Sequence, residues 1–471
     1  MHKDNTRQHD RGWCASAHAS LCALGAYLRR IGFFRPLEEH VHIKQKKVKY
    51  TAVQKLEMLF VALLAGAKTV AQTGTTVRVD PALWRAFGLP GCAEQSVIAQ
   101  TLDAATAEDV AALQDAMAEI FSRHSQARRH DFRQALLVLD VDLSPLPTSK
   151  HAEGATRGYM GRCRSKTGRK LVRARAAAYQ ETVWEEVVPG NTAESLPVLQ
   201  QALGQAERLL GLDGEGAGAQ AKRARTEIRL DSAWGSDVIL PWLLARGYQI
   251  TGKFRSANRM HKLVTGIPTW QSTSSEGREV ARVPQPVVFA RPLAQYAVRT
   301  PSTAHTDGYY YAVVFTTRTD LTMQQVVEEY DQRASLEADI KADKRGLGLG
   351  VIRKRRLAAQ KVVVLLMQLA HNVLVWARTW LSRTVTRLRG YGIVRLIQEI
   401  WAVPGEIRLG RAGVQHVRLR REHPRARDVC CGLRGLLASS PIRVILAYRW
   451  AAAIAITGSF AGRSITSVGT V

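Results

Sequence analysis

The chain has 471 residues, which is too long for one small core and predicts about three domains. Hydrophobic residues make up 46% and charged residues 23% of the chain, a balance that excludes disordered and fibrous proteins. The 67 lysines and arginines exceed the 40 acidic residues, which gives a formal net charge of +27. Such an excess favours a polyanionic partner, above all nucleic acid, although a general arginine enrichment without any ligand would give the same number.

Cysteine spacing and hydropathy argue against several other classes. None of the six cysteines has the two-residue spacing of a zinc site, and Cys430 and Cys431 are adjacent, which is poor geometry for a disulfide. Residues 1–12 are polar, so no secretory signal is expected there. The apolar stretch 362–380 is interrupted by polar side chains and predicts a buried core helix rather than a membrane span. We therefore expect a reduced, cytoplasmic protein that associates with the nucleoid and not with a membrane.

Residues 1–125 are predicted to form a helical domain. Apolar residues recur at helical spacing in 51–70 and in 107–125, and turns that contain Pro and Gly separate these segments. A basic segment, 42–49, precedes the first of them, so the domain could hold a helix-turn-helix that binds DNA. The alternative is a helical cap that only packs on the rest of the protein.

Residues 126–254 show the alternating strands and helices of an α/β domain. Short apolar or β-branched runs predict the strands, and helical periodicity predicts the helices between them. The predicted strands are 135–139, 171–188, 226–230 and 248–254, and the predicted helices are 195–210 and 236–246. The turn Pro189-Gly190-Asn191 ends the second strand segment, and 211–221 reads as a Gly- and Ala-rich link.

The character of the chain changes after residue 254. β-Branched residues and prolines are frequent in 255–318, which we interpret as an inserted β-rich segment. Residues 319–385 return to helical periodicity, with one helix predicted over 321–344 and the apolar helix after it. The last part, 386–471, is a basic C-terminal region of mixed character.

Two carboxylates interrupt the apolar run that begins at 135. Asp140 and Asp142 are two residues apart, so a strand would point both to the same face. A carboxylate at the end of a buried strand costs free energy unless it is paired or binds a metal. The alternative is an ordinary aspartate that caps the turn before Pro145.

Asp231 follows directly on the predicted strand 226–230, and a turn of small residues leads from it into a helix. Catalytic groups often occupy such strand ends, because the strand fixes their direction while the loop leaves them open. The alternative is a helix N-cap, but Ser236 is better placed for that role, which leaves Asp231 without a capping function.

The helix predicted over 321–344 carries one polar stripe. At about 100° per residue, its members fall within roughly 60° of each other. They are Tyr330, Arg333, Glu337, Lys341 and Lys344. The neighbouring acid Asp339 points nearly the opposite way. The alternative is a solvated face on which Arg333 and Glu337 form a helical ion pair.

Together, Asp142, Asp231 and Glu337 give a ligand set made only of oxygen atoms. Oxygen ligands suit Mg²⁺ or Mn²⁺ and not zinc. Two such ions can activate the attacking oxygen and stabilise the leaving oxygen in phosphoryl transfer. Lys341 and the other basic residues of the stripe would then hold a phosphate backbone beside Glu337.

The stripe also contains the complete spacing Tyr-x2-Arg-x3-Glu-x6-Lys, formed by Tyr330, Arg333, Glu337 and Lys344. With it the sequence resembles the DDE transposases of bacterial insertion sequences, in the branch that this motif marks. The likeness covers about 130–385. Ala334 departs from the pattern, because the family often has Trp after the Arg.

Two other segments contribute to the resemblance. Pro189-Gly190-Asn191-Thr192 is similar to the turn that usually follows the family's second strand. The stretch 231–236 resembles the family's Asp-x-Gly-aromatic block with its order altered. The residues after Asp142 fit the family pattern better than those after Asp140, so Asp142 is preferred as the first acid and Asp140 remains its rival.

The resemblance implies an RNase H-like catalytic core that the β-rich insertion interrupts before the helix of Glu337. It implies that Asp142, Asp231 and Glu337 ligate two Mg²⁺ ions, for which Mn²⁺ can substitute. Tyr330, Arg333 and Lys344 would contact DNA near the transposon end. Trp234 would either stack on an unpaired base or pack in the core.

The implied activity is metal-dependent hydrolysis at the terminal inverted repeats of an insertion sequence, followed by strand transfer into target DNA. A homodimer is implied, because two ends must be held at once. The alternatives are a degenerate or repurposed protein that binds DNA without cutting it, and a stand-alone nuclease on the same core.

Overall fold

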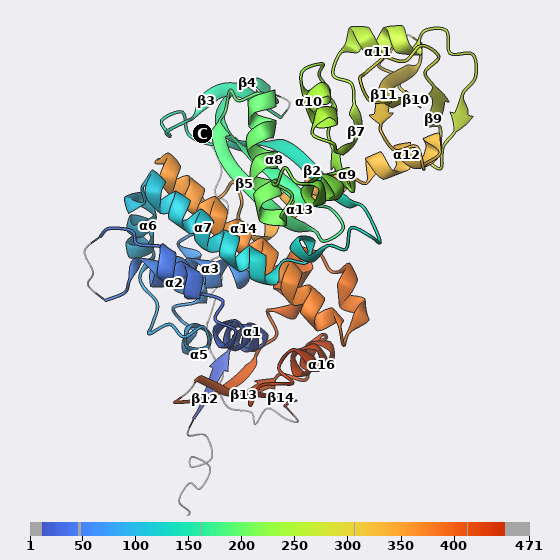
Figure 1. Cartoon of the computed structure of the whole chain (residues 1–471). Helices are drawn as coiled ribbons and strands as arrows, with labels where there is room; N and C mark the ends of the chain where they lie inside the picture. The colour runs from blue at the N-terminus through green and yellow to red at the C-terminus, as the bar shows by residue number, and fades with distance from the viewer. Residues whose placement is uncertain (1–11, 46–48, 162, 306, 412, 448–471) are drawn as a thin grey trace, which may run out of the picture.

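Figure 1 shows the computed structural model, which describes residues 12–45, 49–161, 163–305, 307–411 and 413–447. It contains a layer of helices, a large sheet with helices of its own, and a small four-stranded sheet. Both sheets mix parallel and antiparallel pairs. The α/β class predicted from the sequence is therefore confirmed.

The helical layer comes mostly from the first part of the chain. Its elements are β1 (Trp13–Ser16), α1 (Ala19–Arg30), α2 (Arg35–His40), α3 (Ala52–Leu64), α4 (Gln72–Thr76), α5 (Pro81–Ala86), α6 (Gln95–Ala104), α7 (Ala107–His124) and η1 (Ala127–Arg129). Capping boxes at Thr51 and Thr106 begin α3 and α7, because each threonine satisfies a backbone N–H that the helix leaves free. Strand β1 was not predicted.

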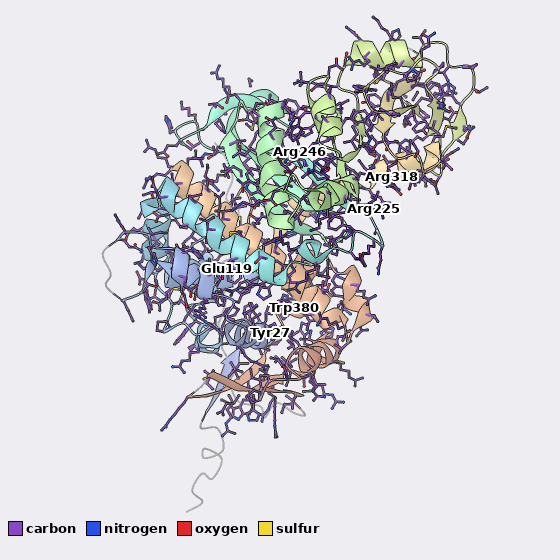
Figure 2. The ribbon with its side chains drawn as sticks, viewed as in Figure 1. Tyr27, Glu119, Arg225, Arg246, Arg318 and Trp380 are labelled. Carbon is purple, nitrogen blue, oxygen red and sulfur yellow. The ribbon has the colours of Figure 1, made fainter. Side chains whose placement is uncertain are left out.

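The layer packs on the long helix α14 (Leu357–Ser382) through α3, α6 and α7. The rings of Tyr27 in α1 and Trp380 in α14 meet edge to face, with centroids 5.2 Å apart (Figure 2). This packing is that of a helical cap. Residues 41–45 form no helix, and part of the basic segment 42–49 lies outside the described residues.

The large sheet has the strand order β3-β4-β2-β6-β7-β11-β10-β9-β8, and β5 pairs with β4 as well. Around β2, the pairs β5–β4 and β4–β2 are antiparallel, whereas β2–β6 and β6–β7 are parallel. The bounds are β2 (Leu137–Pro147), β3 (Thr156–Met160), β4 (Cys163–Ala176), β5 (Glu181–Pro189), β6 (Thr226–Arg229), β7 (Gln249–Lys253), β8 (Gln271–Ser272), β9 (Glu279–Arg282), β10 (Ala294–Pro301) and β11 (Tyr309–Thr316).

Helices connect and cover these strands. They are α8 (Leu196–Leu210), α9 (Ala217–Ala224), η2 (Ser232–Trp234), α10 (Ile239–Ala245) and α11 (Ala257–Val264). Helix α8 packs on β5 and β4. The prediction of a link over 211–221 was wrong in part, because α9 begins inside it. Strands β8–β11 and α11 form a lobe that projects from the rest of the molecule and joins the sheet where β11 pairs with β7 (Figure 1).

The helix predicted over 321–344 is two helices, α12 (Met323–Asp331) and α13 (Ala334–Gly346). Gln332 and Arg333 between them keep α-helical backbone angles, but the hydrogen bonds across the joint run over three residues instead of four. Tyr330 therefore ends one helix, and Glu337, Lys341 and Lys344 lie on the next.

Helix α14 is long and apolar enough to cross a membrane, but 89% of its most apolar window is buried inside the protein. Its polar groups are used internally: Asn372 exchanges hydrogen bonds with the backbone of Thr182, and His371 contacts Asp343. It is a core helix, as its interrupted hydropathy predicted.

The small sheet has the order β1-β12-β13-β14. In this sheet residues 13–16 pair with residues 405–408, so segments from near the two ends of the described chain lie side by side. The elements of this part are η3 (Thr386–Gly390), α15 (Ile393–Arg395), η4 (Leu396–Ile400), β12 (Gly405–Gly410), β13 (Gly413–Leu419), α16 (Ala426–Leu436) and β14 (Arg443–Leu446). The sheet lies at the end of the molecule away from the projecting lobe (Figure 1).

Candidate functional site

Asp142 lies on β2 near the point where the strand leaves its pairing with β6, and it is 9% exposed. Its Oδ2 accepts a hydrogen bond of 2.6 Å from the Ser144 hydroxyl. Its Oδ1 accepts one of 2.8 Å from the Nη2 of Arg333. The strand and the serine fix this carboxylate, and the arginine is its cationic partner.

Asp140 points to the same side of β2 but is completely buried. Arg229, its register partner on β6, donates two hydrogen bonds to it, at 2.7 and 2.9 Å. Arg175 on β4 donates a third at 3.3 Å. A carboxylate with two arginines and no solvent contact has no room for a further ligand, so the geometry favours Asp142 over Asp140 as the first acid.

Asp231 follows β6 and begins the short helix η2. Its Oδ1 accepts a hydrogen bond of 2.9 Å from the backbone N–H of Ala233, whereas Ser236 makes no side-chain cap of α10. The expectation that Asp231 has no capping role was therefore wrong. Its Oδ2 remains free of the cap and lies 4.0 Å from the Nη2 of Arg333.

The loop after Asp231 is held close to β7 by Gly235. A Cβ atom at Gly235 would lie 1.9 Å from the carbonyl oxygen of Lys253, so only glycine allows this approach. Trp234 beside it is completely buried. Of the two roles expected for Trp234, packing in the core is the one observed, because the buried ring is not accessible for stacking on a base.

Glu337 lies in the first turn of α13, and 56% of its side chain is exposed. Its Oε1 is 4.0 Å from the Nη1 of Arg333. On the opposite side of the same helix, Asp339 forms an ion pair of 2.6 Å with Arg175. The helical geometry predicted this separation of the two acids.

Arg333 thus lies between the three candidate acids, a position that the sequence pattern did not indicate. It is 5% exposed and also donates a hydrogen bond of 3.3 Å to the Val141 carbonyl. Its Nε has no hydrogen-bond partner among the described residues. Burial would lower the pKa of Arg333, but Asp142 and Asp231 outweigh burial and raise it. Burial in turn raises the pKa of Asp231, with a further contribution from Asp142.

The remaining residues of the stripe differ in exposure, whereas residues on one face of a single helix would be similarly exposed. Tyr330 is 7% exposed and packs with apolar side chains, under the Nζ of Lys253 at 4.7 Å from the ring centre. Lys341 is exposed and Lys344 half-buried. Burial lowers the pKa of Lys344, and Arg173 lowers it further.

The residues present fit a hard divalent cation by their chemistry. Three carboxylates, the ligand type that such a cation prefers, lie around the one guanidinium of Arg333. Across the part of the chain that the structure describes, no three Asp, Glu, His or Cys side chains are close enough to enclose an ion. In this arrangement the guanidinium of Arg333 links the three acids.

A second buried ionic cluster lies behind the site. Arg173 pairs with Glu185 and Asp343, each at 2.7 Å, and His371 contacts Asp343 at 2.8 Å. Burial opposes the charge on His371, but Asp343 raises its pKa. This cluster connects β4, β5, α13 and α14, and therefore fixes α13 against the sheet.

Comparison with known proteins gives one family. The family model described as the transposase DDE domain matches residues 133–373, just over half of the chain. No curated protein matches the sequence.

Two solved structures are similar to the chain at low levels. One is a piggyBac transposase synaptic complex with hairpin DNA, at 12% identity and a TM-score of 0.41, with 83% of each chain covered. The other is a pre-cleavage Mos1 transpososome, at 13% identity and a TM-score of 0.17, with 44% of this chain and 61% of that chain covered. These scores are too low to carry an argument.

Proposed function

Because this chain belongs to the transposase DDE domain family, it is an enzyme that cleaves and transfers DNA strands, and we propose that Asp142, Asp231 and Glu337 are its catalytic carboxylates. The observation that carries this proposal is that all three acids lie within 4.0 Å of one guanidinium, that of Arg333. They come from β2, the end of β6 and α13, three separate parts of the matched region.

The three acids would hold two Mg²⁺ ions, and Mn²⁺ would substitute. When bound, such ions stabilise charge on the attacking and leaving oxygens of the phosphodiester. The protein orients the acids beforehand. Ser144 holds one oxygen of Asp142, and the Ala233 N–H holds one oxygen of Asp231, so the other oxygen of each faces Arg333.

The basic residues around the acids would position the DNA backbone. Lys341 is exposed and Lys344 half-buried on α13, so both extend from the helix that carries Glu337. Arg333 and Tyr330 are buried here. Arg333 would reach the DNA only after it leaves the carboxylates, which a competing cation would favour, and Tyr330 only after it leaves its apolar neighbours.

The strand order supports an RNase H-like core. Strand β4 pairs antiparallel with β5 and with β2. On the other side of β2, strand β6 pairs parallel with β2, and β7 pairs parallel with β6. We assign 126–254 and 319–385 to this core, 255–318 to an insertion, 1–125 to a helical domain and 386–471 to a C-terminal region. The motif formed by Tyr330, Arg333, Glu337 and Lys344 supports the insertion-sequence branch.

The proposed substrates are the terminal inverted repeats of an insertion sequence and the target DNA. We propose that a homodimer holds the paired ends in the cytoplasm at the nucleoid. The net charge of +27 supports a polyanionic partner, because lysine and arginine gain affinity for DNA by releasing its counterions.

The decisive test is cleavage and joining of the element's own ends with Mg²⁺. We expect Asp231→Asn and Glu337→Gln to lower both rates by about 100-fold or more, as loss of a group that stabilises transition-state charge does. Asp339→Asn is the matched control on α13. Wild-type rates in the first two variants would reject the proposal, and cleavage without joining would identify a nuclease.

A further inference from the structure

The small sheet carries a basic row on the face that points away from the protein. Trp13, Arg408, His416 and Arg443 are register partners across β1, β12, β13 and β14, so their side chains lie side by side. The neighbouring residues on β12, β13 and β14 point to the other face and are buried: they are Ile407, Val417 and Val444. Helices α1 and α16 pack against the sheet on that buried side.

The arginines of this row lack internal counterions. Arg408 and Arg443 are both exposed, and neither forms an ion pair with a carboxylate in the described parts of the chain. Arg418, one step along β13, differs, because it pairs with Glu406 at 2.9 Å. Other arginines of the sheets are neutralised in the same way as Arg418, as Arg173 and Arg229 show.

A groove of about 1020 Å³ continues this row between α1, α5 and the ends of β13 and β14. Four arginines line it and no lining residue is acidic; the arginines are Arg29, Arg30, Arg85 and Arg443. Arg29 is balanced by Glu38 and Glu57. Arg30 donates a hydrogen bond to the Ser439 hydroxyl and has no carboxylate partner among the described residues, and Arg85 lies over the ring of Trp84.

We propose that this basic row and the groove beside it, together the distal surface, bind the phosphate backbone of duplex DNA outside the active site. The inference rests on the proposed function, because it takes its partner from the activity of a DNA transposase. In Figure 1 the helical layer lies between this surface and the large sheet that carries the candidate acids. The surface therefore contacts a part of the DNA other than the cleaved bond.

The spacing of the row suits a duplex. Arg408 and Arg443 lie two strands apart, or about 10 Å at the usual strand separation. This distance is comparable with the width of a DNA groove, so both can contact phosphates of one duplex. The concentration of positive charge also affects His416: burial lowers its pKa, and Arg408, Arg443 and Arg418 lower it further.

The aromatic residue of the row argues against a single-strand site. Proteins that bind single strands stack the bases on exposed rings. The guanidinium of Arg418 lies over the ring of Trp13, 4.1 Å from its centre, and His416 contacts the same ring. Arg408 and Arg443 are exposed, whereas Arg418 already occupies a face of the Trp13 ring, which favours backbone contacts over base stacking.

The test compares two double variants of the full chain by their binding to a random-sequence DNA duplex over a range of salt concentrations. The double variant Arg408→Gln, Arg443→Gln removes the two exposed arginines of the row that have no carboxylate partner in the described part of the chain. Arg389→Gln with Arg427→Gln removes equal charge from exposed positions on η3 and α16, outside the distal surface. We expect the first pair to reduce the slope of log affinity against log salt by roughly 2 and the second pair to leave it nearly unchanged.

Three outcomes would overturn the inference: an unchanged slope in the first pair, an equal reduction in both pairs, or a loss of affinity for single-stranded RNA but not for the duplex. Thermal melting checks that both variants fold. Asp231→Asn separates this inference from the catalytic one, because that protein should keep the full salt slope while it fails to cleave. Cleavage by Asp231→Asn would reject the catalytic proposal and leave the distal surface in place.

Discussion

Asp140 and Asp142 lie two residues apart on the same side of β2, yet their surroundings are opposite. Asp140 is completely buried and receives hydrogen bonds from two arginines, Arg229 and Arg175. Asp142 must share the single guanidinium of Arg333 with Asp231 and Glu337. Asp140 thus has two arginines in ion pairs, whereas three acids share one arginine and receive only a longer-range attraction from Lys253 and Lys344.

The difference separates a structural carboxylate from one that can bind a ligand. Buried charge is tolerated when it is paired, so the Asp140 cluster is complete as it stands. In the Asp142 cluster three carboxylates share one guanidinium, and the side chains of Asp231 and Glu337 are open to solvent, so a divalent cation can reach them. Counting cations around each acid therefore distinguishes the two better than burial alone.

The largest expected effect is on folding. Asp140→Asn leaves Arg229 buried without its carboxylate, while Arg175 keeps Asp339, and we expect a loss of about 3–5 kcal/mol in the free energy of unfolding. Asp142→Asn should cost less, because Arg333 keeps Asp231 as a partner. Urea denaturation of the two variants measures this directly, and a larger loss in Asp142→Asn would contradict the comparison.

Removal of the shared guanidinium should affect metal binding next. In Arg333→Gln the acids lose the charge that competes with a metal, so we expect the DNA-free protein to bind Mg²⁺ about tenfold more tightly or better. Calorimetric titration measures the affinity. Arg299→Gln, which removes an ion pair with Glu279 in the projecting lobe, is the control. Weaker binding in Arg333→Gln would mean that the guanidinium supports the site instead of competing for it.

A smaller effect concerns pH. Burial raises the pKa of Asp231, so above its ordinary pKa the folded protein holds a proton that the unfolded chain has lost. Without divalent cations, the free energy of unfolding should then fall as pH rises through the raised pKa. Asp231→Asn should remove this decline in a series of urea titrations at different pH. Parallel profiles for the variant and the wild type would show that the open cluster does not destabilise the fold.

The smallest effect is expected at the edge of the closed cluster. Asp339 is 20% exposed and is a second partner of Arg175, which keeps Asp140 when Asp339 is changed. Asp339→Asn should therefore cost only about 1 kcal/mol of unfolding free energy and leave DNA cleavage intact. A loss of cleavage here would place Asp339 in the site and end its use as a control for Glu337→Gln.

The sequence predicted much of the local structure because the relevant signals are local. Strand ends and helical periodicity selected Asp142, Asp231 and Glu337, and their catalytic roles stay predictions. The pairing of Asp140 with Arg229 could also have been predicted from the sequence. Arg229 precedes Asp231 by two residues, the same offset that separates Asp140 from Asp142. On neighbouring parallel strands, equal offsets place such residues side by side.

Other features depend on packing that no local pattern records. Arg333 reaches the acids because ion pairs to Arg173 and Arg175 of β4 fix α13 against the sheet. The joint at Gln332 buries Tyr330 and Arg333 while it leaves Glu337 exposed. Trp234 is buried by the approach of β7. Strand β1 is only four residues long and has no strand pattern of its own, because it is defined by pairing with β12.

The pairing of β1 with β12 has a consequence for biosynthesis. Trp13 leaves the ribosome almost four hundred residues before its partner Arg408, and at 5–20 residues per second this delay is roughly 20–80 s. During that interval residues 13–16 have no strand to pair with, whereas the strands around Asp142 and Asp231 are already complete. Among the described residues the small sheet is therefore the last part to assemble, and a chain that stops before residue 405 lacks Arg408, His416 and Arg443 of the distal surface.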